Sequence, residues 1–211
     1  MNFSHIKNII FDLGGVIINI DLMLTYNALA NHCPLNADEV QQKFIDNQVF
    51  EKYEKGLLSS QEVRKLLNNE LKFSLSDLEM DKCWNALLLD IPIERIELIK
   101  KLRGKYKLFL LSNTNAIHID EVNAILYKTT GIEKLNDLFD KIYYSFDIGM
   151  AKPDVEIYKH VLLENNINAS ETLFLDDNTD NIEGARLAGI NPIPVTTDNS
   201  IIQILKDAIK S

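Results

Sequence analysis

The chain has 211 residues, 46% of them hydrophobic and 25% charged, so it is long enough to bury one sizeable core together with a further subdomain. A formal net charge of −9, with 22 basic residues scattered among 31 acidic ones, argues against nucleic acid as a partner. The sequence has no apolar run long enough to span a membrane and no signal peptide, so we expect no membrane insertion and a cytoplasmic protein.

Short apolar runs and amphipathic runs alternate along the chain. The apolar runs predict buried strands at residues 6–11, 107–112, 141–146, 172–176 and 192–195. The amphipathic runs predict helices at residues 92–104, 153–166 and 181–189, with proline near the start of the first two and glycine after the first and third. This order of strands and helices predicts an α/β fold with a parallel sheet and helices on both faces.

One long segment breaks this alternation directly after the first strand. Residues 21–90 carry no strand pattern, and capping-box sequences begin two of their helices, at Ser59 with Glu62 and at Ser76 with Glu79. We therefore expect an all-helical cap subdomain inserted into a core. That core comprises residues 1–20 and 91–211. A cap over an open α/β sheet usually covers a ligand site, because ligands bind outside the carboxyl ends of the strands.

Polar side chains follow four of the predicted strands. They are Asp12 after the first strand, Ser112 and Asn113 after the second, Lys152 after the third, and Asp176 and Asp177 after the fourth. Because the carboxyl ends of parallel strands meet at one edge of a sheet, we expect these groups to converge. Crowded carboxylates need a hard cation, and Mg²⁺ is commonly bound by one or two of them with water and substrate phosphate. A carboxylate can also attack phosphorus, while lysine, hydroxyl and amide groups hold the phosphoryl oxygens.

At these residues the sequence resembles the haloacid dehalogenase superfamily over nearly its whole length. The stretches that carry the resemblance are "FDLGGV", "LSNTN", "AKP" and "FLDDNTDNIEGA", in this order. The resemblance implies a Rossmann-like core, a magnesium cofactor and a small phosphorylated substrate whose phosphoryl group passes to Asp12. It also implies that Mg²⁺ is bound by Asp12, the carbonyl of Gly14 and Asp177, with Asp176 either a further ligand or an outer support. The residues that it implies for holding the phosphoryl group are Ser112, Asn113 and Lys152.

Gly14 departs from the usual pattern of superfamily phosphatases, which carry an aspartate two residues after the nucleophile. Such an aspartate gives a proton to the leaving oxygen, and its loss lowers the rate by a factor on the order of 10² to 10⁴ unless something compensates. A closer resemblance, to bacterial α-D-glucose-1-phosphate phosphatases, implies a substrate whose hemiacetal oxygen leaves readily. Alternatively, Asp21 or an acid on the cap such as Glu54 supplies the proton.

Two other functions stay open. The chain could bind phosphate ligands or a partner in a regulatory, non-catalytic role. It could also hydrolyse a carbon–halogen bond, in which case the nucleophilic aspartate forms a carboxylic ester and no second acid is needed. The retained acids and Lys152 favour a metal-dependent phosphatase over both alternatives.

Overall fold

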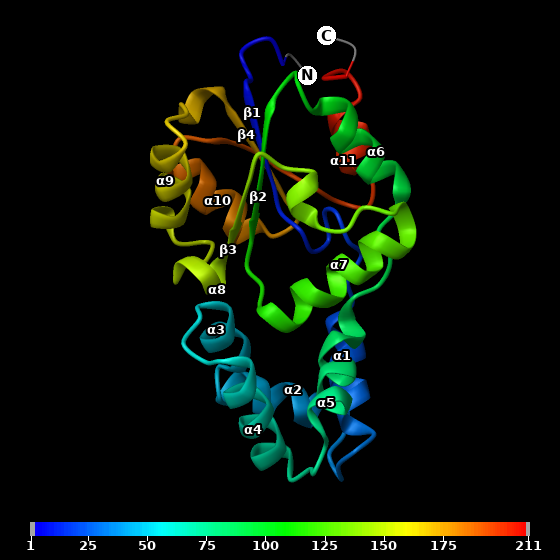
Figure 1. The fold of residues 1–211 in the computed structure, drawn as a ribbon. Helices are drawn as coiled ribbons and strands as arrows, with labels where there is room; N and C mark the ends of the chain where they lie inside the picture. Colours follow the sequence, from blue (N-terminus) through cyan, green and yellow to red (C-terminus); the bar gives the residue numbers. More distant parts are fainter. Residues whose placement is uncertain (1–2, 210–211) are drawn as a thin grey trace.

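The computed structural model describes residues 3–209 and contains a five-stranded parallel sheet in the order β3-β2-β1-β4-β5 (Figure 1). The strands are β1 (Asn8–Phe11), β2 (Lys107–Ser112), β3 (Lys141–Tyr144), β4 (Thr172–Asp176) and β5 (Asn191–Pro194). All the predicted strands are present, and the α/β class is confirmed. In the central strand β1, Ile10 pairs with Phe109 of β2 and Phe174 of β4. A strand covered on both faces needs the uninterrupted apolar run seen there.

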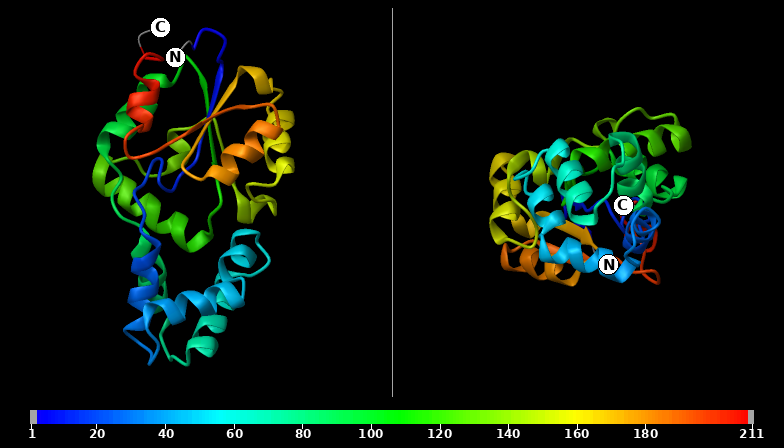
Figure 2. Two further views of the ribbon diagram at one scale, coloured as in Figure 1. Left: turned by 180° about the vertical axis from the view of Figure 1, so that it is seen from behind. Right: turned by 90° about the horizontal axis from the view of Figure 1, so that it is seen from below.

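Alternate side chains of β1 face opposite layers of helices. Ile9 and Phe11 belong to an apolar cluster with α6 (Ile93–Leu102), α7 (Ala116–Thr130) and α11 (Ile201–Leu205). Ile10 belongs to another cluster with α9 (Val155–Glu164) and α10 (Thr179–Leu187). The rear view in Figure 2 shows these two groups of helices on opposite sides of the sheet. The sheet has a helix layer on each face because successive side chains of a strand point to opposite faces.

Helix ends lie close to the predicted positions. Gly104, just after α6, has φ of +84°, and Gly189, just after α10, has φ of +81°. Glycine adopts this left-handed conformation readily, so it ends a helix in the predicted way. The predicted helix at 153–166 instead begins at Val155, because the backbone of Asp154, with ψ of 127°, is not helical. The helix predicted from residue 181 begins earlier, since Asn178 caps it.

The helices between β1 and α6 form a separate unit below the sheet in Figure 1. They are α1 (Leu22–Ala30), α2 (Ala37–Asp46), α3 (Val49–Glu54), α4 (Ser60–Leu71) and α5 (Asp77–Trp84). We call α1–α5 the helical unit. The predicted capping boxes at Ser59 and Ser76 are present, and a third at Asn36 was not predicted. The apolar faces of these helices pack around Trp84, which is 1% exposed, in a cluster that also includes Ile117 of α7.

Paired chain segments and an aromatic contact join the helical unit to the sheet. The Asn19 carbonyl accepts a hydrogen bond from the Leu89 N–H at 3.0 Å. Trp84 stacks on His118 of α7 with ring centroids 5.5 Å apart, and its Nε1–H donates to Asn115 Oδ1 at 3.2 Å. A large buried ring with a satisfied N–H restrains how the two parts are oriented.

Short helices complete the connections. They are α8 (Ser145–Ile148) and the 3₁₀ turns η1 (Asn85–Leu87), η2 (Leu135–Asp137) and η3 (Ala169–Glu171). Among the helices of residues 3–209, none is both long and apolar enough to cross a lipid bilayer.

Candidate active site

The candidate site lies at the carboxyl ends of β1 and β4, where the strand order reverses. The chain passes from β1 to β2 and β3 on one side, whereas β4 and β5 lie on the other side of β1. The connections lead away from such a point and leave a crevice between the two strands. Asp12 directly follows β1, and Asp176 ends β4. These two acids therefore enter the crevice from neighbouring strands.

Three carboxyl groups and one ammonium group meet in this crevice. Carboxylate oxygens of Asp12, Asp176 and Asp177 lie within 4.8 Å of one another. Lys152 Nζ lies 2.7 Å from Asp12 Oδ1 and donates to Asp176 Oδ2 at 2.6 Å. Lys152 is 4% exposed and Asp176 is fully buried. The lysine is thus not a surface residue, and its charge is directed at two acids of the cluster.

Burial shifts the protonation equilibria of this cluster. It raises the pKa of Asp12 above its usual range, against the opposing field of Lys152, and Asp176 adds to the rise. Burial and then the charge of Asp176 raise the pKa of Asp177. Burial would lower the pKa of Lys152, but Asp12 and Asp176 outweigh it and hold that pKa above its usual range. The cluster therefore carries a surplus of negative charge that a bound cation would stabilise.

Asp176 is held by the start of α10 through contacts that the sequence did not indicate. Its Oδ1 accepts hydrogen bonds from the Asn178 N–H at 2.8 Å and from Asn181 Nδ2 at 3.0 Å. Asn181 Nδ2 also lies 3.1 Å from Oδ2, the oxygen that accepts from Lys152. The asparagine Asn178 could be recognised as a helix cap from its position, but Asn181 carries no such signal. With both oxygens engaged, Asp176 fixes the direction of the Lys152 ammonium group.

Two glycines after β1 leave space that the site uses. Gly15 has φ of +69°, and a Cβ there would lie 2.2 Å from Asp177 Oδ2. A Cβ on Gly14 would lie 3.0 Å from Ile20 Cδ1. The Asp177 carboxyl group can therefore approach the chain after β1 only because Gly15 has no side chain. Ile20 occupies the space beside Gly14 into which a side chain would extend.

The end of β2 brings Ser112 and Asn113 to the same edge. Ser112 is buried, and its Oγ donates only a long hydrogen bond of 3.4 Å to the Asn113 carbonyl. A bond of this length is weak, so the hydroxyl is available for a ligand. The Asn113 side chain donates to the Lys152 carbonyl at 2.8 Å and accepts from the Lys152 N–H at 2.9 Å. Asn113 thus positions the backbone of Lys152, and its predicted contact with a phosphoryl group requires its amide to change partners.

Among the cavities that adjoin these residues, two are lined by both Gly14 and Asn113. One of about 450 Å³ lies over the cluster, with Asp12, Lys152 and Asp177 in its wall. The other, of about 340 Å³, lies between the sheet and the helical unit, and we call it the junction cavity. Gly14, Ser112 and Asn113 line it from the sheet side, and Tyr26, Phe50 and Glu54 line it from the helical unit. Both cavities share Gly14 and Asn113, so a ligand at the cluster can extend into the junction cavity.

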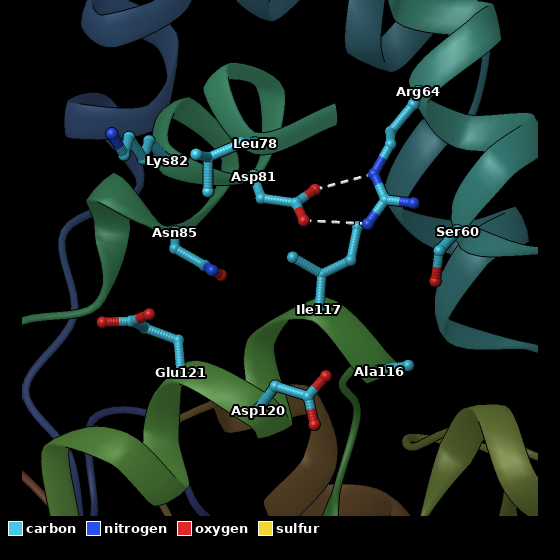
Figure 3. A pocket seen from close by; sticks show the side chains of 10 residues that line it. All are labelled: Ser60, Arg64, Leu78, Asp81, Lys82, Asn85, Ala116, Ile117, Asp120 and Glu121. Carbon is cyan, nitrogen blue, oxygen red and sulfur yellow. Dashed lines mark hydrogen bonds and ion pairs between the residues drawn. The ribbon is translucent and has the colours of Figure 1, made fainter. Parts of the chain in front are cut away.

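A larger cavity, of about 480 Å³, opens between α4, α5 and α7, away from the strand ends (Figure 3). Arg64 donates to both carboxylate oxygens of Asp81 at 2.8 Å. The other charged groups in the wall are Lys82, Asp120 and Glu121. Because its arginine is already paired and its acids outnumber its cations, this cavity is poorly suited to a phosphate group.

The donor set at the strand ends fits a hard divalent cation. When all are ionised, the three carboxylates and the Lys152 ammonium group leave two negative charges in the crevice. Carboxylate oxygens are the ligands that Mg²⁺ prefers. Asp12 and Asp177 could ligate such an ion, and Asp176 lies beside them as the third carboxylate of the group.

The cluster of acids and lysine lies at the switch point of a parallel sheet, where proteins with open α/β sheets bind their ligands. The chain belongs to the haloacid dehalogenase-like hydrolase family, whose model matches residues 6–189. It is 34% identical to the D-ribitol-5-phosphate phosphatase of Bacteroides thetaiotaomicron, over 84% of this chain and 85% of the relative. It is 26% identical to the sesquiterpene phosphatase astK of Aspergillus oryzae, over 90% of each chain. The fold is also similar to a crystal structure of a haloacid dehalogenase family enzyme from B. thetaiotaomicron in complex with magnesium and inorganic phosphate. The two chains are 35% identical with a TM-score of 0.85, and the match covers 94% of this chain and 98% of that one.

Proposed function

We propose that the protein is a magnesium-dependent phosphatase that hydrolyses a small phosphorylated metabolite, with sugar phosphates such as a hexose 1-phosphate as the leading class. The observation that carries the proposal is the position of Asp12, 2.7 Å from the buried Lys152 and in the wall of a cavity of about 450 Å³. An accessible carboxylate beside a fixed ammonium group is suited to receive a phosphoryl group. The relative named as a D-ribitol-5-phosphate phosphatase and the related structure with magnesium and phosphate support this reaction class.

Each side chain has a defined task in this reaction. Asp12 attacks phosphorus, and the bond from phosphorus to the leaving oxygen breaks as the bond to Asp12 forms. Lys152 and Ser112 donate hydrogen bonds to the non-bridging phosphoryl oxygens. Water then attacks phosphorus, which releases phosphate and restores Asp12. When bound, Mg²⁺ would neutralise part of the negative charge on the phosphoryl oxygens.

Asp12, the carbonyl of Gly14 and Asp177 are the magnesium ligands of this proposal. All three residues line the cavity over the cluster. Asp176 is fully buried, and its oxygens accept hydrogen bonds from Lys152 and α10. These contacts favour outer support of the metal by Asp176 over direct ligation.

We also propose that the helical unit is a cap on a core of residues 1–20 and 91–211. Its Tyr26 and Phe50 lie in the wall of the junction cavity, which Ser112 and Gly14 line from the other side. A phosphoryl group at the cluster would leave the rest of the substrate in this cavity. Substrate choice is then decided by the helical unit.

The walls of the junction cavity favour a second candidate substrate class, apolar phosphate monoesters. Most of the residues in these walls are apolar, among them Leu13, Ile18, Ile20 and Leu87. A leaving group with a hydrocarbon surface would gain free energy there by losing contact with water. The relative named as a sesquiterpene phosphatase is compatible with this class.

Phosphate release from a small panel of esters tests the proposal. The panel comprises glucose 1-phosphate, glucose 6-phosphate, ribitol 5-phosphate and farnesyl phosphate, each with Mg²⁺ or with EDTA. We expect Mg²⁺-dependent turnover of at least one ester by the wild type and none by Asp12→Asn. Preference for glucose 1-phosphate would support an easily leaving hemiacetal oxygen, and preference for farnesyl phosphate would support the second class. A folded protein that binds Mg²⁺ but releases no phosphate would contradict the proposal and favour a regulatory role or carbon–halogen hydrolysis.

A further inference from the structure

The strand ends leave the leaving oxygen without a proton donor. An alkoxide is a poor leaving group, so cleavage of an alkyl phosphate is faster when an acid protonates the departing oxygen. Gly14 has no side chain, and Ile20 fills the adjacent space. Lys152 is paired with Asp12 and Asp176. Asp176 also accepts a hydrogen bond from Asn181. The helical unit, on the opposite side of the site, can supply such a donor.

The junction cavity contains three titratable side chains, Tyr26, Glu54 and His118. Burial lowers the pKa of His118 to about 3, so this ring is neutral near pH 7. Its Nδ1 is also hydrogen-bonded to Asn85 Oδ1 at 2.8 Å. Burial raises the pKa of Tyr26 above its usual range, which makes this hydroxyl a weaker acid still. Of the three groups, Glu54 is the one suited to exchange a proton near neutral pH.

Glu54 is the last residue of α3 and lies between two cavities. It lines the junction cavity with Gly14 and Ser112, and a neighbouring cavity of about 320 Å³ with Lys152. The turn after it is set against α8, since Gly56 has φ of +68° and a Cβ there would lie 2.4 Å from the Phe146 carbonyl oxygen. Figure 1 shows α3 directly below α8 at the end of the sheet. The fold thus places the end of α3 opposite the strand ends.

The Glu54 carboxyl group is half-buried and, within residues 3–209, forms no hydrogen bond or ion pair. Burial raises its pKa to about 7, against the opposing field of Lys152. The other charged groups in the wall of the neighbouring cavity are Glu51 on α3, Lys55 directly after α3, and Asp154. Glu51 and Lys55 lie 3.3 Å apart as an ion pair. Both the protonated and the ionised form of Glu54 are therefore populated near pH 7.

We propose that Glu54 is the general acid and general base of the reaction. This inference rests on the proposed phosphatase function. As Asp12 attacks phosphorus, the Glu54 carboxyl group transfers its proton to the leaving oxygen, which departs as an alcohol. The Glu54 carboxylate then takes a proton from the water that attacks the phosphoenzyme, and the bond from phosphorus to Asp12 breaks. Phosphate is released, and both side chains return to their starting states.

Asp21, the other acid considered from the sequence, has a different role. It is the N-cap of α1, and its Oδ1 accepts the Met23 N–H at 3.0 Å. It is exposed to solvent and contributes to none of the cavities described above. A helix-capping role accounts for its contacts.

The test compares leaving groups in rapid-mixing experiments on wild type, Glu54→Gln and the matched control Glu51→Gln. A 4-nitrophenolate ion leaves without protonation, whereas the oxygen of glucose 6-phosphate needs a proton. With 4-nitrophenyl phosphate, we expect Glu54→Gln to release about one equivalent of nitrophenolate at the wild-type rate and then to turn over slowly, because only the second step needs the base. With glucose 6-phosphate, we expect its single-turnover rate to fall by a factor on the order of 10² to 10⁴. Glu51→Gln should match the wild type with both esters.

Three outcomes would overturn the assignment of Glu54. These are unchanged kinetics of Glu54→Gln with glucose 6-phosphate, an equal loss of the first step with both esters, and the same losses in Glu51→Gln. The proposed function fails separately, if the wild type releases phosphate from none of the esters of the panel or if Asp12→Asn still releases it. The burst of nitrophenolate also shows that Glu54→Gln is folded, since it requires an intact Asp12 site.

Discussion

Replacing Gly15 with alanine tests whether the site depends on the close approach of Asp177 to the chain after β1. Gly15 has φ of +69°, and the new Cβ would lie 2.2 Å from Asp177 Oδ2. Gly131 provides a matched control, because it has φ of +75° and a Cβ there would meet no described atom within 4 Å. Both variants carry the same backbone strain, and only Gly15→Ala disturbs the carboxyl group.

The expected magnitudes follow from these two geometries. A left-handed conformation costs alanine about 1 kcal/mol, which lowers the midpoint of thermal unfolding by about 2–4 °C in a chain of this size. Both variants should show at least this loss. In Gly15→Ala, Asp177 must also move by roughly 1 Å, because non-bonded atoms prefer separations of about 3.5 Å. Loss of a group that only supports a metal ligand lowers metal affinity by about 10–100-fold, and we expect at least this loss when Asp177 is displaced.

Thermal unfolding in EDTA and the Mg²⁺ dependence of phosphate release measure the two effects. We expect Gly15→Ala to need about 10–100-fold more Mg²⁺ for half-maximal activity, and Gly131→Ala to need the wild-type amount. Normal Mg²⁺ dependence in Gly15→Ala would refute the reasoning about Asp177. An equal shift in Gly131→Ala would assign the effect to backbone strain.

Three further measurements test other contacts of the molecule. Lys152→Met leaves buried carboxylates without a partner. In urea unfolding at pH 7 without metal, we therefore expect the free energy of unfolding to fall by about 3–5 kcal/mol. A fall of less than about 1 kcal/mol would contradict the argument from burial. Trp84→Phe keeps an aromatic ring but removes the hydrogen bond to Asn115, so we expect the free energy of unfolding to fall by about 1 kcal/mol. A fall of about 3–5 kcal/mol, which is typical of Trp→Ala, would show that packing of the larger ring dominates. Folding raises the pKa of Glu54 from 4.5 to about 7, so its protonated form stabilises the fold and wild-type stability should fall as pH rises through this range. The fall should be smaller in Glu54→Gln, and equal slopes in the two proteins would be evidence against a raised pKa.

Local patterns were sufficient to predict the strands and several helix ends. The run at residues 6–11 is apolar without interruption, which only a strand covered on both faces requires, and β1 is such a strand. The capping boxes at Ser59 and Ser76 were predictable because their partners lie three residues away. The start of α9 was wrong by two residues, since proline at position 153 is compatible both with a first helical turn and with the segment before it.

Contacts between distant segments could not be predicted in this way. The side chain of Asn113, predicted to hold a phosphoryl group, also pairs with the backbone of Lys152, a residue 39 positions away, and the sequence did not indicate this contact. Asn181 is only five residues from Asp176, but its hydrogen bond to that acid depends on how α10 leaves the sheet, which no local pattern indicates. The sequence offered both Asp21 and Glu54 as acids, and it contained no means of choosing between them.

The sequence by itself determined which chemical groups stand at the strand ends, among them Asp12, Lys152 and Asp177, because strand and helix patterns are local and parallel strands share one carboxyl edge. Only the tertiary structure decided which of these groups pair, how much of each is buried, and that Glu54 and Gly14 line the same cavity. Such properties depend on distances between residues far apart in the chain, and these distances are set by the packing of helices on the sheet.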